Sequence, residues 1–144
     1  MEAQNYSNHR RFVPMFHGVL FGILVLTLIG SAVNLYLSWG DHQRIYSASL
    51  ILVLDIASLM LFVFCRVFAC KAQDRAIKAE ENLRHFVLTG KLLEPNLSVP
   101  QIVALRFASD GEFVMLAHLA AEEKMAPDSI KRAVKQWRPD LYRV

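Results

Sequence analysis

One acidic residue stands inside a long apolar stretch of the sequence, and its type and position call for a chemical explanation. Asp55 lies within the apolar run that covers residues 46–70. A carboxylate near the centre of a membrane span costs at least about 2.5 kcal/mol on insertion scales, so we expect it to have a role. Three roles are open: a proton or ion relay, a hydrogen-bonded acid that fixes how two helices pack, and an ion pair with another subunit.

The other reactive side chains do not form a known catalytic or metal-binding pattern. Cys65 and Cys70 would lie about 140° apart around a helix, which disfavours a disulfide between them. His85 and His118 have no second ligand at metal-binding spacing. The sequence also contains no Gly-rich phosphate loop, no H-E-x-x-H and no G-x-S-x-G. We therefore expect no catalytic, cofactor-binding or metal-binding residues and no enzymatic activity.

Two apolar runs must position Asp55, and both have the length of a membrane span. They cover residues 16–37 and 46–70, and about twenty apolar residues in a helix cross a hydrocarbon core of about 30 Å. The connector, residues 38–45, contains the turn formers Gly40 and Asp41. The predicted fold class is all-α: a two-span transmembrane helical hairpin with a cytosolic helical C-terminal domain. A cleaved signal peptide is the competing interpretation of the first run, which is long for a signal core.

Polar residues recur on one side of each predicted span. At 100° per residue, the set in the first span falls within an arc of about 60° and the set in the second within about 80°. The two sets are therefore expected to face each other as an intramembrane polar seam. The seam consists of Thr27, Ser31 and Asn34 in the first span and Ser47, Asp55 and Ser58 in the second. Gly18 and Gly22 lie on the opposite side of the first span and form a candidate helix-packing face toward another helix.

Basic residues near the span ends predict the orientation. Arg10 and Arg11 lie in the N-terminal segment, residues 1–15, whereas the connector holds only Arg44. Five more basic residues lie at the end of the second span or after it: Arg66, Lys71, Arg75, Lys78 and Arg84. By the positive-inside rule, both termini are cytosolic and the connector is extracytoplasmic.

The C-terminal half reads as a helical extension, residues 71–90, followed by a small cytosolic helical domain, residues 91–144. Gly90 suits the end of the extension, which pairs Asp74 with Lys78 and Glu80 with Arg84 at i,i+4 spacing. Capping boxes are predicted at Ser98 with Gln101 and at Ser109 with Glu112, and Pro127 opens a last helix that reaches Trp137. The expected core consists of Leu105, Phe113, Leu116, Leu119, Ile130, Val134 and Trp137.

The last predicted helix carries a candidate basic cytosolic surface, formed by Lys131, Arg132, Lys135 and Arg138. A DNA-reading helix is one interpretation of these residues. However, the net charge of the chain is only +3, and nucleic-acid binding draws on clustered positive charge. We therefore expect anionic lipid or an acidic partner at this surface and do not expect nucleic acid.

Three segments resemble a family of small two-span bacterial membrane proteins to which no function is assigned. They are QNYSNHRRFVPMFH (residues 4–17), LTGKLLEPNLSVPQIVALRFASDGEF (residues 88–113) and PDSIKRAVKQWRPDLYRV (residues 127–144). The chain departs from the family at Ala126, where members carry Ser as a helix cap. The resemblance implies the architecture, but no activity and no functional residues.

Together these features favour a non-enzymatic interaction or scaffold subunit of the bacterial cytoplasmic (inner) membrane. We expect it to contact membrane lipid and to form a homo-oligomer or part of a larger membrane complex. The alternative is a proton- or ion-coupled transport subunit that uses the intramembrane carboxylate of Asp55.

Overall fold

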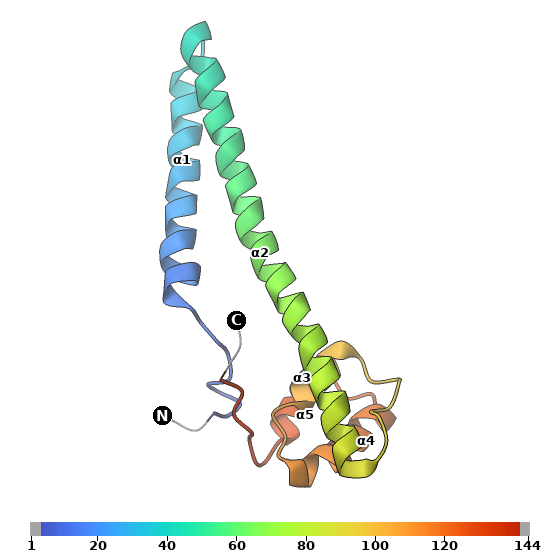
Figure 1. Cartoon of the computed structure of the whole chain (residues 1–144). Coiled ribbons are helices and arrows are strands. Elements are labelled where there is room, and N and C mark those ends of the chain that lie inside the picture. Colours follow the sequence, from blue (N-terminus) through green and yellow to red (C-terminus); the bar gives the residue numbers. More distant parts are fainter. Residues whose placement is uncertain (1–3, 142–144) are drawn as a thin grey trace. The chain divides into compact units, whose positions relative to one another are not determined.

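The computed structural model describes residues 4–141, and its regular elements within that range are all helices (Figure 1). The expected all-α class is therefore confirmed for this part of the chain. In chain order the elements are the π-helical segment η1 (Met15–Leu20), α1 (Phe21–Leu37), α2 (His42–Thr89), α3 (Val99–Leu105), α4 (Asp110–Glu122) and α5 (Pro127–Ala133). The chain divides into two compact units, Phe12–Phe68 and a second unit built from residues on either side of it.

The first unit contains η1, α1 and the first part of α2, which run antiparallel on the two sides of a short turn (Figure 1). α1 ends at Leu37, and the chain reverses at Gly40, whose φ of 92° favours a residue without a Cβ. Asp41 precedes α2, and its Oδ1 accepts the backbone N–H of Gln43 at 3.0 Å. The two predicted turn formers therefore separate the two helices.

Both long helices are long and apolar enough to cross a membrane. The segments are Met15–Leu37 and His42–Thr89, and their most apolar windows have mean hydropathies of 2.2 and 2.5. Only 6% of each window is buried within the protein. The core helix of a soluble domain is mostly buried, so these windows instead turn their apolar side chains outward.

Small side chains near the turn, and aromatic rings at the other end, hold the first unit together. Ser31 on α1 is 5% exposed and Ala48 on α2 is 1% exposed. Small residues at such positions let two helix backbones approach closely. The rings of Phe16 and Phe62 stack with their centroids 4.3 Å apart, and Phe21 lies 5.8 Å from Phe62.

The second unit combines residues 4–11 with the part of the chain from Ala69 onward. It begins with the C-terminal part of α2, which ends at Thr89 before Gly90. The φ of Gly90 is 74°, and its N–H donates to the carbonyl of Phe86 at 2.7 Å. The glycine cap predicted for this helix is therefore confirmed.

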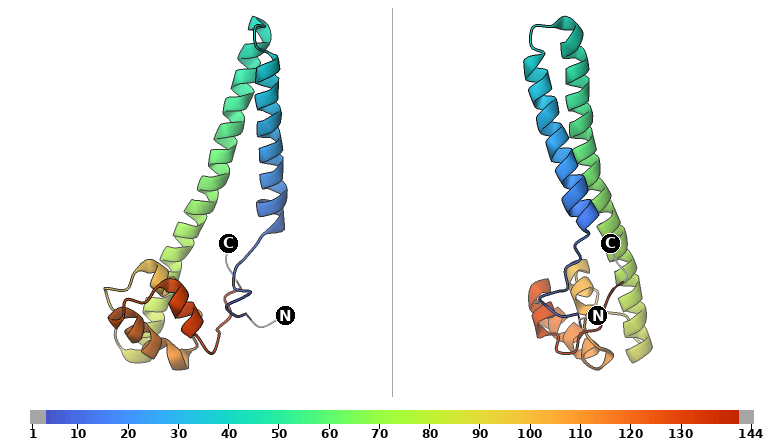
Figure 2. Two further views of the ribbon diagram at one scale, coloured as in Figure 1. Left: turned by 180° about the vertical axis from the view of Figure 1, so that it is seen from behind. Right: turned by 90° about the vertical axis from the view of Figure 1, so that its left-hand side faces the viewer.

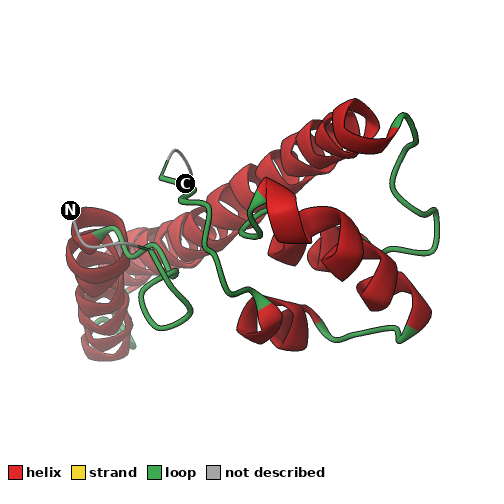
Figure 3. Cartoon of the chain, turned by 90° about the horizontal axis from the view of Figure 1, so that it is seen from below, coloured by secondary structure: helices red, strands yellow, loops and turns green. Residues whose placement is uncertain are grey.

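The helices α3, α4 and α5 close an apolar core in the second unit, and Figure 3 shows the loops that join them. The largest fully buried side chains are Phe107, Phe113, Ile102, Leu105 and Ile130. Two residues of the predicted core are not fully buried. The prediction is wrong for Leu119, which is 37% exposed, and Trp137 is only partly buried.

One of the two predicted capping boxes is present. The Oε1 of Gln101 accepts the backbone N–H of Ser98 at 2.8 Å, and the cap of α3 is complete. At α4 the prediction is wrong, because the capping box between Ser109 and Glu112 does not form. The carboxylate of Glu112 instead accepts the backbone N–H groups of Lys135 and Gln136, at 3.2 and 3.0 Å.

The same contacts explain why α5 is shorter than predicted. It ends at Ala133, and Val134 is extended, with a ψ of 119°. Glu112 holds the following backbone, and Ala108 then pairs with Trp137 in an isolated bridge. A tertiary partner therefore ends the helix before Trp137, which no local pattern in the sequence indicates.

Candidate functional site

The hydroxyl groups of the predicted polar seam donate hydrogen bonds to backbone carbonyls of their own helices. Thr27 donates to the carbonyl of Ile23 at 3.0 Å, and Ser58 donates to the carbonyl of Leu54 at 2.8 Å. Ser31 and Ser47 likewise donate to carbonyls three residues earlier in the chain. Serine and threonine in helices commonly satisfy themselves in this way, which lets them lie in an apolar helix without a partner across the interface.

The residues of the seam differ in burial. Ser31 is buried, and Asp55 and Ser58 are half-buried, whereas Thr27, Asn34 and Ser47 are exposed. Within residues 4–141, the carboxylate of Asp55 has no hydrogen bond or ion pair. The structure therefore turns only part of the predicted seam inward.

The predicted helix-packing face is open. Gly18 is exposed and lies in η1, and Gly22 is half-buried at the start of α1. Apart from its chain neighbours and the nearby backbone of its own helix, a Cβ added at either glycine would meet no atom within 4 Å.

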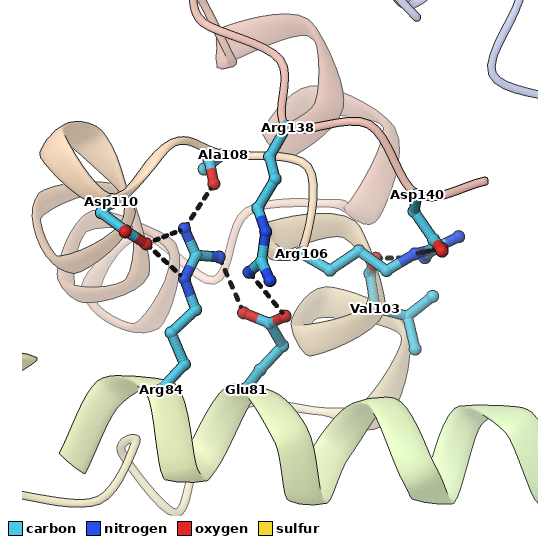
Figure 4. A network of polar contacts seen from close by, with 8 residues as sticks. All are labelled: Glu81, Arg84, Val103, Arg106, Ala108, Asp110, Arg138 and Asp140. Carbon is cyan, nitrogen blue, oxygen red and sulfur yellow. Dashed lines mark hydrogen bonds and ion pairs between the residues drawn. The ribbon is translucent and has the colours of Figure 1, made fainter. Parts of the chain in front are cut away.

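The most extensive set of charged contacts lies in the second unit and is centred on Arg84 (Figure 4). The side chain of Arg84 is 10% exposed and binds Glu81 at 2.9 Å and Asp110 at 2.7 Å. It also donates to the carbonyl of Ala108 at 2.7 Å, and its guanidinium lies 4.2 Å from the ring centroid of Phe113. A buried guanidinium requires such complete pairing, because removing it from water is costly.

Arg138 extends these contacts, and Arg106 forms a second set of contacts beside them (Figure 4). Arg138 lies 3.8 Å from the 6% exposed carboxylate of Glu81. Arg106 binds Asp140 at 2.7 Å, donates to the carbonyl of Val103, and stacks over a phenylalanine ring of the core. We call Glu81, Arg84, Arg106, Asp110, Arg138 and Asp140 the charged network.

Local spacing predicts a different partner for Arg84. The i,i+4 rule pairs it with Glu80, whereas the structure pairs it with Glu81. Glu81 and Arg84 both face α3–α5, so they meet there, whereas Glu80 is exposed. The second predicted pair, Asp74 with Lys78, forms no ion pair among the described residues.

The segment that precedes the first long helix docks on the rest of the second unit. The hydroxyl of Tyr6 donates to Asp128 at 2.7 Å. The ring of His9 lies 5.8 Å from Phe107 and 5.9 Å from Trp137. Gln4 and Arg11 bind the backbone of Asp140 and Leu141, at 2.7 and 3.1 Å. The partners in these pairs are at least 98 residues apart in the sequence, so the sequence offers no spacing signal for them.

Most of the candidate basic surface takes part in these contacts. Arg132 binds Asp128 at 2.9 Å and lies 4.8 Å above the ring of Tyr6. Lys131 lies 3.4 Å from a ring nitrogen of His9, and Arg138 belongs to the charged network. The hydrogen bonds from Tyr6 and Arg132 lower the pKa of Asp128. Lys135 is exposed.

A cavity of about 510 Å³ lies beside the charged network. Its lining mixes charged and apolar side chains, among them Arg11, Ile77, Glu81, Arg106, Arg138 and Leu141. Its acids and bases are mostly paired with one another, so they serve chiefly to hold the domain together. Among the described residues, no three His, Cys, Asp or Glu side chains gather as a metal site would require.

Comparison with known protein families gives a match over the whole chain. The profile of a family described as "Family of unknown function (DUF6526)" matches residues 1–144. No curated protein and no solved structure matches the chain significantly.

Proposed function

The chain belongs to the family of unknown function DUF6526, and we propose that it is a two-span integral membrane protein that acts as an interaction or scaffold subunit. In this proposal it is not an enzyme, it lies in a bacterial cytoplasmic membrane, and it belongs to a homo-oligomer or a larger complex. One observation carries the proposal: two antiparallel helices have apolar windows of which only 6% is buried within the protein.

The outward apolar side chains need an apolar surrounding. In water, a continuous exposed surface of this kind would drive aggregation, whereas a bilayer solvates it and the helices satisfy their own backbone groups. α2 has 48 residues and is about 72 Å long at 1.5 Å per residue, more than twice the hydrocarbon thickness. We therefore place its charged C-terminal part outside the membrane.

The asymmetry of basic residues supports cytosolic termini. Arg10 and Arg11 precede the first helix and Lys71, Arg75 and Lys78 follow the second span, whereas the connector holds only Arg44. The second unit then lies in the cytosol, where it offers its surface to a soluble partner or to anionic lipid heads.

Membrane extraction and cysteine labelling test this proposal. In a variant with Cys65→Ala and Cys70→Ala, Gln43→Cys probes the connector and Glu123→Cys probes the C-terminal domain. We expect the chain to resist extraction by alkaline carbonate. A membrane-impermeant maleimide should label Gln43→Cys in spheroplasts and Glu123→Cys only after lysis. Release by carbonate, or the reverse labelling pattern, would overturn the membrane assignment or the orientation.

The alternative function is proton- or ion-coupled transport through Asp55. It is favoured by one observation: this carboxylate is half-buried and has no partner within residues 4–141. Proteoliposomes that enclose a pH-sensitive dye distinguish the two functions. A proton flux that wild-type protein supports and Asp55→Asn abolishes would replace the scaffold proposal, whereas equal background flux in both would exclude a proton relay.

A further inference from the structure

The C-terminal part of α2 uses only one of its faces in the second unit. Ile77 and Glu81 are 6% and 5% exposed and face α3–α5, which lie along one side of this part of the helix (Figure 2, right). At 100° per residue, Phe86 lies about 180° around the helix from Ile77. Leu83 and Phe86 are 63% and 51% exposed. An apolar face therefore points away from the domain.

The residues of this face repeat with the spacing of a coiled coil. They alternate three and four residues apart, as the a and d positions of a heptad do. In order they are Ala69, Ala72, Ala76, Ala79, Leu83 and Phe86, and we call them the α2 seam. Ala76 lies at the edge of this face, where it also lines the cavity beside the charged network. Alanines let two helix backbones approach closely, and the two larger side chains at the end supply most of the apolar area.

Two oppositely charged residues flank the α2 seam. Arg75 takes a g position and Glu80 takes the following e position; both are exposed, and neither forms an ion pair among the described residues. In a parallel pair of helices, a g residue lies beside the e residue five positions later in the partner. Arg75 of one copy would thus meet Glu80 of the second copy, twice in a symmetric pair.

From this pattern we infer that the α2 seam is the interface of a parallel homodimer. The inference rests on the proposed membrane placement, since two copies inserted in the same orientation have parallel α2 helices. A two-fold axis along the membrane normal then makes the interface self-complementary and closed. The second copy covers the apolar side chains that the domain leaves exposed, and the Arg75–Glu80 pairs fix the parallel alignment.

Disulfide cross-linking in native membranes tests the dimer with matched controls. In the full chain carrying Cys65→Ala and Cys70→Ala, cysteines are placed at Ala72 and Ala79, which are d positions. The controls are Lys71→Cys and Lys78→Cys, one residue earlier on the side of the helix away from the seam. Under mild oxidation we expect at least tenfold more cross-linked dimer for A72C and A79C than for the two controls. An antiparallel pair cannot join both d positions to themselves.

Charge reversal tests the flanking pair in the A79C protein. Arg75→Glu and Glu80→Arg should each lower the cross-linked fraction several-fold, because like charges then face each other. The double variant R75E/E80R should restore it, which simple misfolding would not do. Equal cross-linking at Ala79 and Lys78, or no rescue by the double variant, would overturn the inference.

Carbonate extraction of the same samples separates this inference from the proposed function. Protein that stays in the membrane without seam cross-links overturns the dimer alone. Protein that is extracted and still cross-links supports the dimer and overturns the membrane placement. Protein that is extracted and does not cross-link overturns both.

Discussion

Arg84 of α2 and Asp110 in the first turn of α4 are joined by two short contacts. The Nε and Nη2 atoms of Arg84 lie 2.8 and 2.7 Å from the same carboxylate oxygen (Figure 4). The guanidinium also binds Glu81 on its own helix and the carbonyl of Ala108 before α4. One side chain thereby fixes the start of α4 on the end of the long helix.

We expect Arg84→Met to destabilise the second unit strongly. The change retains most of the apolar stem but leaves the 6% exposed carboxylate of Glu81 without its nearest partner. Removing one member of a buried ion pair typically costs about 3–5 kcal/mol. Trp137 fluorescence during denaturation, in a Trp39→Phe background, measures the free energy of unfolding. Lys78→Met, at an exposed position of the same helix, is the control and should change it by less than about 0.5 kcal/mol. Equal effects of the two changes would refute the structural role of Arg84.

The docking of the N-terminal segment should depend on pH. Hydrogen bonds from Tyr6 and Arg132 lower the pKa of Asp128 below its ordinary 3.8. The ionised carboxylate therefore favours the docked state, and its full contribution is present above about pH 4. That contribution is lost as the pH falls from 3.8 through the lower pKa of the docked state. Trp137 fluorescence reports docking, because His9 lies 5.9 Å from its ring.

Tyr6→Phe removes the main cause of that lowered pKa. We expect weaker docking at neutral pH and a smaller pH transition, because the remaining hydrogen bond from Arg132 lies within α5 and forms in the docked and undocked states alike. Asp128→Asn should abolish the transition. A transition that persists in Asp128→Asn would assign the pH dependence to another group.

Because the two helices pack closely near the turn of the first unit, a larger side chain at a buried position of α2 should lower the stability of the helix pair. Ala48 is 1% exposed, whereas Ala57 on the same helix is exposed. Overpacking a close contact costs about 1–3 kcal/mol, so Ala48→Leu should destabilise the paired helices by that amount. Ala57→Leu should leave stability within about 0.5 kcal/mol of wild type. Unfolding in mixed detergent–SDS micelles measures both variants, and a larger loss for Ala57→Leu would contradict the packing of the first unit.

Local patterns in the sequence predict the elements of this protein better than their contacts. The apolar runs, the turn at Gly40 and Asp41, and the cap of α3 at Ser98 depend on neighbouring residues and are found in the structure. The partner of Arg84 depends on which side of α2 faces the domain, and spacing alone favours the wrong glutamate.

Contacts between distant parts of the chain leave no local trace. Tyr6 and Asp128 are 122 residues apart, and each is an ordinary polar residue in its own segment. Glu112 looks like a capping residue of α4, but a tertiary contact with the backbone after α5 takes its carboxylate. The sequence therefore gives no signal for the charged network or for the docking of the N-terminal segment.

The glycine face of the first helix gives a last prediction, on assembly. A Cβ added at Gly18 or Gly22 would meet no atom within 4 Å apart from its chain neighbours and the nearby backbone of its own helix. Gly18→Leu and Gly22→Leu should therefore leave the fold and membrane insertion of one copy unchanged. If this face contacts another helix, the same changes lower assembly, because small residues permit the close approach. Size-exclusion chromatography with light scattering in mild detergent measures the assembly, with Val19→Leu at an exposed neighbouring position as the control.

Because the α2 seam lies on the other helix, A79C cross-linking should survive both glycine changes. A fall in higher assemblies with intact A79C dimers would assign the glycine face to a second, separate contact, whereas unchanged assembly would remove the glycines from the interaction surface.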